Sequence, residues 1–363
     1  MLPIDISNYH QELLVFSVFF GFVISYLSLE TVYWVSKKKN LMDDPEERSS
    51  HVTRIPTLGG VAVYLSVLTT ILCFGTFFNT NTMMMFLASI SVLLFLGLKD
   101  DLLVLSPHKK FLIQIFVSLL FIILTDIRIT SLFGLFQIHT LPYLHSIAFS
   151  LFVMILIINA VNMIDGIDGL AAGFGVSATS ALCVLHYFED QIGLAVVGLS
   201  VVGALIAFLR LNVSKRRKMF MGDTGSMIVG FCIAALTINF LKASTVNDDS
   251  LFSISAPVIA LSILFFPLLD TFRVFMLRIF KYRTSPFKAD RNHIHHYFLN
   301  YLQGHIKVSL LLITINLVIV ICSFFVTFLV IEYYLGLMIF IGVNLYLISF
   351  LLVKKFFNMS PDE

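Results

Sequence analysis

The sequence predicts an all-α integral membrane protein with about eleven transmembrane helices, and three observations lead to this fold class. The 363 residues are 58% hydrophobic and only 13% charged, with a mean hydropathy of +0.94. Long apolar runs recur along the chain, and runs of about 18 residues or more are typical of transmembrane helices, which satisfy every backbone polar group within the bilayer. The lysines and arginines are concentrated between alternate runs. A soluble globular domain is excluded, because such domains do not combine these features.

The apolar spans follow one another without an internal repeat, so one integral membrane domain over residues 1–363 is expected. Pro267 should kink or break the ninth span, because proline removes a backbone donor from a helix. The eleven spans are expected at residues 13–35, 57–78, 83–98, 111–126, 143–161, 169–187, 191–209, 226–243, 253–275, 308–331 and 334–353.

The distribution of positive charge predicts the orientation of these spans. If the N-terminus lies outside, the outer segments carry only Arg128 and Lys242 of the 24 lysines and arginines. Cytoplasmic loops are enriched in these residues, so the N-terminus should be outside and the C-terminus cytoplasmic. Among the outer segments, residues 127–141 (IRITSLFGLFQIHTL) have the β-branched and aromatic pattern of a small β-hairpin, with an irregular amphipathic loop as the alternative.

The segment 159–170, NAVNMIDGIDGL, places polar residues where the fifth span leaves the bilayer. Asn162, Asp165 and Asp168 recur every three residues, so a helical continuation would bring them to roughly one face. Carboxylates that converge at a membrane surface suggest a hard divalent cation, for which Mg²⁺ is the first choice. The alternative is a solvated turn of glycine and aspartate.

Two further inner segments carry carboxylates. Asp100 and Asp101 follow the third span, and Lys110 begins the fourth. GDTGS, at 222–226, places Asp223 at the start of the eighth span, where a helix N-terminus suits a phosphate; ordinary helix capping is the alternative. Phe220 could stack on a nucleobase or anchor at the membrane interface.

The fifth inner segment contains RNHIHH, at 291–296. Its histidines are too closely spaced for the i, i+4 pair of a helical zinc site, and they suit hydrogen bonding to a pyrophosphate, with a solvated polar loop as the alternative. Carboxylates, a divalent cation and basic side chains on one surface indicate phosphoryl transfer. A position at the bilayer surface suggests a lipid phosphate acceptor. A transporter would instead place its carboxylates near the bilayer midplane, usually within repeats.

Taken together, these motifs resemble the polyprenyl-phosphate N-acetylhexosamine-1-phosphate transferases, glycosyltransferase family 4, in the undecaprenyl-phosphate GlcNAc-1-phosphate branch. The resemblance covers nearly the whole chain, with a motif in each of five inner loops in the expected order. It implies transfer of a HexNAc-1-phosphate, GlcNAc-1-phosphate in first place, from a UDP-sugar to undecaprenyl phosphate. UMP would be released, and a lipid-linked glycan of the cell envelope, such as O-antigen lipopolysaccharide or a cell-wall polymer, would be started.

The resemblance also implies roles for particular residues. The expected catalytic residues are Asp100, Asp101, Asp165, Asp168, Lys110, His293, His295 and His296. The expected substrate-binding residues are Arg48, His51, Asn162, Asn212, Phe220, Gly222 and Arg291. The expected metal ligands are Asp223, Asp100 and Asp165, for Mg²⁺ or, as the alternative, Mn²⁺.

The histidine segment bears on the branch of the family. Ile294 interrupts the histidines, whereas the related phospho-MurNAc-pentapeptide transferases typically have three in a row, and Asn292 stands where glutamate is often found. The interrupted histidines favour the GlcNAc-1-phosphate branch, and the pentapeptide transferase is the alternative within the family. The expected location is the bacterial inner membrane, with a cytoplasmic active site. The expected partners are the UDP-sugar, undecaprenyl phosphate and the lipid bilayer, with no nucleic acid; a homodimer is left open.

Overall fold

The structure, a computed structural model, describes residues 9–43, 54–103, 105–246, 250–252, 255–283 and 293–327. The predicted span at 334–353 lies outside these residues, and so do the predicted site residues Arg48, His51 and Arg291. The expectation of one domain over residues 1–363 stays a prediction.

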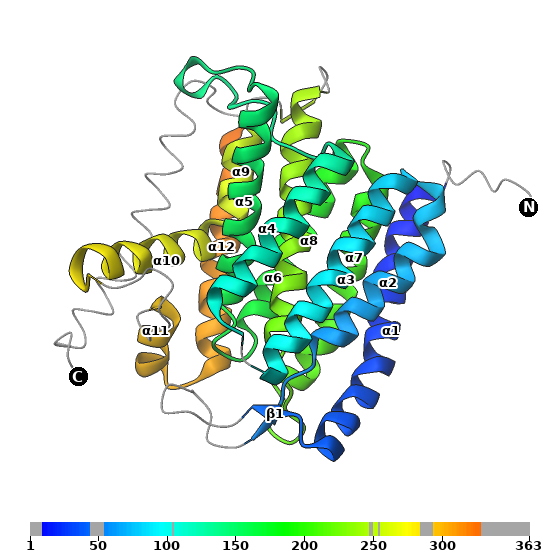
Figure 1. Cartoon of the computed structure of the whole chain (residues 1–363), viewed down its shortest axis with the longest axis vertical. Helices are drawn as coiled ribbons and strands as arrows, with labels where there is room; N and C mark the ends of the chain where they lie inside the picture. Colours follow the sequence, from blue (N-terminus) through cyan, green and yellow to red (C-terminus); the bar gives the residue numbers. More distant parts are fainter. Residues whose placement is uncertain are drawn as a thin grey trace, which may run out of the picture.

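The described residues form a bundle in which nine helices are long and apolar enough to cross a membrane (Figure 1). They match the first eight predicted spans and the tenth, so the predicted fold class is confirmed. These helices are α1 (His10–Lys39), α2 (Gly60–Phe74, extended by the 3₁₀ turn η2, Gly75–Phe77), α3 (Thr80–Leu103), α4 (Pro107–Thr125), α5 (Tyr143–Met163), α6 (Leu170–Phe188), α7 (Ile192–Asn212), α8 (Gly222–Val246) and α12 (His305–Thr327).

The ninth predicted span is broken into α9 (Ala256–Ile263) and α10 (Phe265–Met276), which continues into a π-helical turn, η4 (Leu277–Lys281). The two parts are bent by 72°. The break lies at Leu264, and Pro267 falls in the first turn of α10, where its missing N–H has no helical acceptor to lose. Figure 1 shows α10 leaving the bundle sideways. The short helix α11 (Ile294–Leu302), next to it, was not predicted from the sequence.

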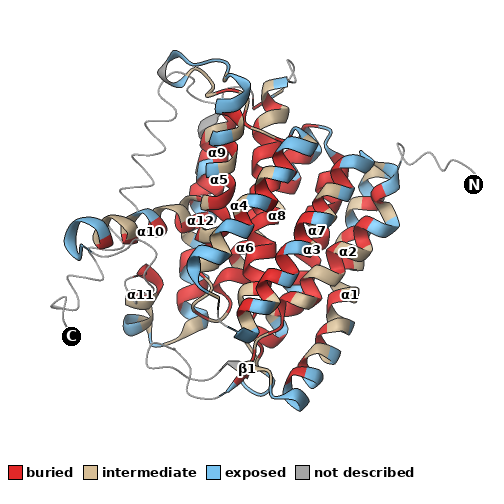
Figure 2. Cartoon of the chain, in the orientation of Figure 1, coloured by how far each residue is buried: buried red, intermediate tan, exposed pale blue. Residues whose placement is uncertain are grey.

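Helix α8 is the centre of the bundle, enclosed by α2, α3, α5, α6 and α7. Its most apolar stretch is completely buried, and Figure 2 shows it surrounded by other helices. Phe231 of α8 packs edge-on against Phe86 of α3 and Phe121 of α4, with ring centroids 5.4 and 5.1 Å away. These aromatic contacts and the apolar packing around them fix the position of α8.

The start of α8 fits between α2 and α3 because glycines allow close backbone approach. A Cβ on Gly97 of α3 would collide with the backbone of Thr224, and one on Gly60 of α2 would collide with the backbone of Gly225. Backbone hydrogen bonds lock the same region, from Gly60 N to Met221 O (2.9 Å) and from Gly59 N to Phe220 O (3.0 Å). A two-stranded antiparallel pair, β1 (Met42–Asp43) and β2 (Ile55–Pro56), lies beside these contacts.

Gly97→Ala should therefore destabilise the protein. The added methyl group meets backbone, which cannot rotate away, and overpacking of this kind costs about 1–3 kcal/mol. The measurement is the apparent melting temperature of purified protein in detergent. Gly304→Ala is the matched control, because the nearest atom to its new methyl group is Lys307 Cδ at 3.6 Å. Equal melting temperatures for the two variants would contradict the tight packing at Gly97.

The segment 127–141 corrects one prediction, because no strand forms in it. A 3₁₀ turn, η3 (Leu135–Gln137), occupies its tip, and Leu141 N donates to Thr130 O at 2.8 Å. Side chains take the hydrogen bonds that a hairpin ladder would have used: Ser150 Oγ accepts from Ile129 N at 2.7 Å, and Thr130 shares a hydroxyl contact with Thr245. The irregular loop is therefore the correct alternative.

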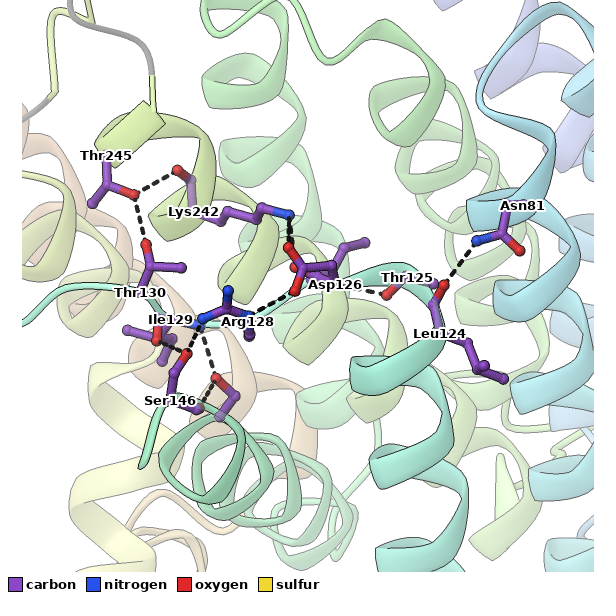
Figure 3. A network of polar contacts seen from close by, with 12 residues as sticks. Asn81, Leu124, Thr125, Asp126, Arg128, Ile129, Thr130, Ser146, Lys242 and Thr245 are labelled. Atoms are coloured by element: carbon purple, nitrogen blue, oxygen red, sulfur yellow. Dashed lines mark hydrogen bonds and ion pairs between the residues drawn. The ribbon is translucent and has the colours of Figure 1, made fainter. Parts of the chain in front are cut away.

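A polar network holds this loop to the neighbouring helices (Figure 3). Asp126 accepts from Arg128 Nε at 2.7 Å and pairs with Lys242 Nζ at 3.1 Å. Arg128 also donates to Ser146 Oγ at 3.0 Å. The two basic residues that the sequence assigned to the outer side thus brace one loop at one end of the bundle. The orientation of the bundle in the membrane stays a prediction.

Candidate active site

The polar motifs of the sequence meet at one end of the bundle, opposite the network of Figure 3. The ends of α3, α5 and α7 and the beginnings of α4, α6 and α8 all lie there (Figure 1). The apolar parts of these helices determine this arrangement, because each buries its length against its neighbours and leaves its polar end free.

Lys110 is the central cation of this end. Its Nζ lies 3.0 Å from Asp100 Oδ2 and 3.0 Å from Asp223 Oδ1, so it joins α3, α4 and α8. Asn162, near the end of α5, donates to the same oxygen of Asp223 at 2.5 Å and to Ser226 Oγ at 2.7 Å. Four helices therefore converge on Asp223, and the lysine offsets the repulsion between the two carboxylates that it contacts.

Asp101 caps the first turn of α8. Its Oδ1 accepts from Asp223 N at 2.7 Å, and its Oδ2 accepts from Thr224 N at 3.2 Å and from Thr224 Oγ1 at 2.6 Å. Gly222 has φ +73°, and a Cβ there would touch Asp101 Oδ2 and Thr57 O, so glycine is needed. The cap is thus supplied by Asp101 of α3, and not by the aspartate or threonine of the GDTGS motif, as the capping alternative had it. Because the N–H groups of Asp223 and Thr224 already donate to the Asp101 carboxylate, these two groups are not open to a phosphate.

A second polar layer lies one helical turn below Lys110. Gln114 is fully buried, and its Oε1 accepts from Asn159 Nδ2 at 2.9 Å, while its Nε2 contacts Met227 Sδ at 3.4 Å. Gln114 follows Lys110 by four residues and Asn159 precedes Asn162 by three, so each pair shares a helix face. This layer fixes the rotation of α4 and α5 beneath the site. The sequence analysis assigned no role to Asn159, although its position at the end of an apolar span was a signal.

The loop between α5 and α6 is held by Asp168. Its Oδ2 lies 2.7 Å from Lys218 Nζ and 3.1 Å from His305 Nδ1 of α12, and its carbonyl oxygen accepts from Ser309 Oγ at 2.7 Å. Burial alone would raise the pKa of Asp168, but the hydrogen bonds from His305 and Lys218 hold it below its usual value. Asp168 therefore anchors the loop as an ionised carboxylate.

Asn212 and Phe220 complete this side of the site. Asn212 is buried and uses both amide atoms on backbone: its Oδ1 accepts from Gly169 N at 2.6 Å, and its Nδ2 donates to Met219 O at 3.1 Å. Lys218 Nζ lies 5.3 Å from the centroid of the Phe220 ring, as in a cation–π contact. Asn212 thus connects the third and fourth inner loops through their backbones.

Asp165 differs from its neighbours, because its carboxylate makes no hydrogen bond or ion pair with any residue that the structure describes. Burial, followed by the charges of Asp223, Asp101 and Asp168, raises the pKa of Asp165 to about 7. A carboxylate among other carboxylates and without a cation is where a divalent ion would be stabilising. No three His, Cys, Asp or Glu side chains among the described residues are arranged to hold a metal by themselves. The residues fit a Mg²⁺ site of two carboxylates, Asp165 and Asp223, completed by water and phosphate oxygens.

Asp165→Asn should raise the melting temperature of the metal-free protein by a few degrees at pH 8. The folded-state pKa of about 7 lies above the value of about 3.9 for an unfolded chain, so ionisation of Asp165 opposes folding. The free energy of unfolding therefore falls as the pH rises from about 4 to about 7, and this loss stays constant above pH 7. The measurement is the melting temperature of wild type and variant in the presence of a chelator at pH 5 and at pH 8. The difference in favour of the variant should be larger at pH 8. An unchanged difference between the two pH values would contradict the raised pKa, and added Mg²⁺ should remove the advantage.

The histidine segment is anchored by Asp270, which the sequence analysis did not single out. This carboxylate on α10 is fully buried; its Oδ2 lies 2.9 Å from His293 Nδ1, and its Oδ1 accepts from Ile294 N at 2.9 Å. A lone aspartate within the ninth apolar span was the signal that could have identified it. Asp270 thus holds the N-terminus of α11 against α10.

His295 connects this segment to the loop after α5. It is 1% exposed, its ring lies between those of His293 and His296, and its Nε2 faces the α-carbon of Gly166 closely enough that a Cβ there would collide. Burial lowers the pKa of His295 to about 3, so its ring is neutral. Its Nδ1 is buried and has no hydrogen-bond partner in the described part of the chain. Such an atom usually has a partner, so it is a candidate substrate contact.

Comparison with known proteins identifies the family of this chain. The model of the family described as glycosyl transferase family 4 matches residues 82–241, which run from the first turn of α3 into the last turns of α8. The undecaprenyl-phosphate alpha-N-acetylglucosaminyl 1-phosphate transferase of Escherichia coli K12 is 32% identical over 269 residues, covering 72% of this chain and 70% of the relative. The protein of the same name from Yersinia pestis is 32% identical over 285 residues, covering 76% and 74%.

A more distant relative extends the match. The probable undecaprenyl-phosphate N-acetylglucosaminyl 1-phosphate transferase of Bacillus subtilis 168 is 28% identical over 306 residues, covering 81% of this chain and 80% of the relative. The matched family region contains Asp100, Lys110, Asn162, Asp165 and Asp223, the residues that the structure gathers at one end of the bundle. With its multi-pass helical bundle, its carboxylate–lysine cluster and these relatives, the chain belongs to glycosyl transferase family 4.

Proposed function

We propose that this protein transfers GlcNAc-1-phosphate from UDP-GlcNAc to undecaprenyl phosphate. The diphosphate bond of the donor is broken, the sugar phosphate is joined to the lipid phosphate, and UMP leaves. The observation that carries the proposal is the Asp100–Lys110–Asp223 cluster at one end of a membrane bundle, in a chain whose relatives are named for this transfer. These names favour this function over a pentapeptide transferase or an ion-coupled transporter.

The residues of the site suit this chemistry in distinct ways. Lys110 supplies a cation for the phosphates, since its ammonium already lies between two carboxylates and is held by three helices. Asn162 orients Asp223, and Asp165 supplies a second carboxylate without a partner among the described residues. Together, Asp223 and Asp165 would hold Mg²⁺, which when bound neutralises diphosphate charge. Mn²⁺ is the alternative ion.

Asp100 is placed to act on the lipid phosphate. Its Oδ1 accepts from Leu105 N at 2.7 Å, and its Oδ2 meets Lys110, so the carboxylate has one fixed orientation near the membrane end of α3. A lipid phosphate is largely ionised at neutral pH, so orientation of the acceptor matters more than removal of its proton. Positioning of this kind is a large term in phosphoryl transfer.

The proposal includes the location of the site. The lipid acceptor is confined to the membrane, and the cluster lies at an end of the helices that span it. We place this end on the cytoplasmic face of the bacterial inner membrane, where a soluble UDP-sugar is available. The segregation of basic residues along the sequence supports this orientation. Dimer formation stays a prediction.

The test is release of UMP by purified protein from a panel of UDP-sugars with undecaprenyl phosphate and Mg²⁺. UDP-GlcNAc should be turned over in preference to UDP-MurNAc-pentapeptide. The reverse preference would move the protein to the other branch of the family. Absence of UMP with every donor, together with ion flux in proteoliposomes, would contradict the transferase.

A further inference from the structure

A cavity of about 630 Å³ opens at the end of the bundle away from the active site. It lies among the beginnings of α1, α3 and α7 and the last turns of α8. The transfer reaction assigns no role to it, because the carboxylate–lysine cluster is at the opposite ends of α3 and α8. Its lining includes Phe78, Thr82, Asp190, Asn239 and Lys242.

Two deeply buried polar side chains line this cavity without full hydrogen bonding. Thr82 is 8% exposed, and its hydroxyl has no partner in the described part of the chain. Asn239 is 7% exposed; His186 Nδ1 donates to Leu182 O, so His186 Nε2 must accept from Asn239 Nδ2 at 3.4 Å. The Oδ1 atom of Asn239 then has no donor among the described residues. Neither of these two oxygen atoms is completely shielded, so both are open to the cavity, which suits a ligand with both donors and acceptors.

The fixed charges of the cavity have both signs. Asp190 is exposed and makes no ion pair with any described residue. Lys242 contributes an ammonium, which Asp126 contacts from one side at 3.1 Å. Helix α7 begins at Ile192 without a side-chain cap, so its first N–H groups add partial positive charge. An anion alone would be repelled by Asp190 and Asp126, and a cation alone would be repelled by Lys242 and the start of α7.

Apolar residues beside these charges face the surroundings of the bundle. Phe77 is 43% exposed and Val246 is 70% exposed, and both line the cavity. At the end of a membrane-spanning bundle, such residues lie near lipid head groups and the upper parts of acyl chains. A ligand with a charged head and an apolar tail would match both parts of the lining.

We propose that this cavity binds the head group of a zwitterionic phospholipid with a primary ammonium, a phosphoethanolamine. The phosphate lies toward Lys242 and the start of α7, and the ammonium lies toward Asp190. The ammonium also donates to Asn239 Oδ1, and the phosphate accepts from Thr82 Oγ1. Choline has no N–H group, so it cannot donate to Asp190 or Asn239, and phosphatidylcholine should bind more weakly.

The test measures binding of phosphatidylethanolamine, phosphatidylcholine and phosphatidylglycerol to delipidated full-length protein by native mass spectrometry. Wild type should bind phosphatidylethanolamine in a saturable way and in preference to the other two. Asp190→Asn should weaken this binding by about fivefold, as expected for loss of an exposed ion pair, and should abolish the preference over phosphatidylglycerol. Asn accepts the left-handed backbone at position 190 (φ 54°), so the fold should be preserved. Thr82→Val is a second variant, which removes only the hydroxyl and should also weaken binding.

Glu30→Gln is the control, since it removes a carboxylate from the other half of α1, outside this cavity. It should leave lipid preference unchanged. Equal effects of Asp190→Asn and Glu30→Gln, or no saturable binding to wild type, would overturn the proposal. Glycerophosphoethanolamine, which has no acyl chains, should compete with the lipid at higher concentration. Competition by inorganic phosphate alone, equal to that of glycerophosphoethanolamine, would show a phosphate site without recognition of the ammonium and would also overturn it.

Discussion

Asp223→Asn should lower kcat by about a thousandfold or more, because the proposed role of Asp223 is to hold a divalent cation, and loss of its charge would then remove several kcal/mol of transition-state stabilisation. The variant keeps the size of the side chain, and Asn162 can still donate to its oxygen. What it loses is the negative charge that Lys110 contacts at 3.0 Å and that a divalent cation would share with Asp165. The measurement is UMP release at saturating donor over a series of Mg²⁺ concentrations, in which the variant should lose most of its response to the metal.

Asp126→Asn is the control for this variant. It also removes an ion-paired carboxylate, but Asp126 lies in the network at the other end of the bundle. Its effect should fall on stability, with kcat of the folded protein near that of wild type. A well-folded Asp223→Asn variant with nearly full activity would show that this carboxylate is not part of the catalytic centre.

Lys110→Met should lower kcat by roughly a hundred- to a thousandfold, the effect typical of removing one preorganised charge from a site that stabilises developing negative charge. Methionine keeps an unbranched chain of similar length, so the packing of α4 is retained. Without the ammonium, Asp100 and Asp223 lose the cation that joins them. The melting temperature of the metal-free variant should therefore fall, and added Mg²⁺ should stabilise it more than it stabilises wild type.

The neighbouring lysine provides a matched control. Lys109 is exposed, and no ion pair of its side chain occurs among the described residues, so Lys109→Met removes the same charge from the same helix turn. It should change kcat less than about twofold, because isolated surface charges contribute little. Similar losses in the two variants would mean that the surface potential, and not the contact of Lys110 with two carboxylates, supports catalysis.

Several features of the site could not be predicted from the sequence. Asp101 was expected to act in catalysis, which stays a prediction, and its capping of α8 through two backbone N–H groups and one hydroxyl was not foreseen. Asp270 was unassigned, yet it holds His293 and the start of α11. Both roles depend on a partner more than twenty residues away, and spacing within a motif gives no information about such a contact.

The sequence by itself determined the helical membrane fold and nine of its spans, because an apolar run of this length in a bilayer can satisfy its backbone only as a helix. It also placed the polar motifs at one end of the bundle, since the alternation of spans and loops assigns each loop to a side. Only the tertiary structure decided what each carboxylate does. Asp100, Asp101, Asp165 and Asp223 have the same chemistry, and their different roles arise from the partners that helix packing gives them: Lys110 for the first and last, the start of α8 for the second, and for Asp165 no partner among the described residues.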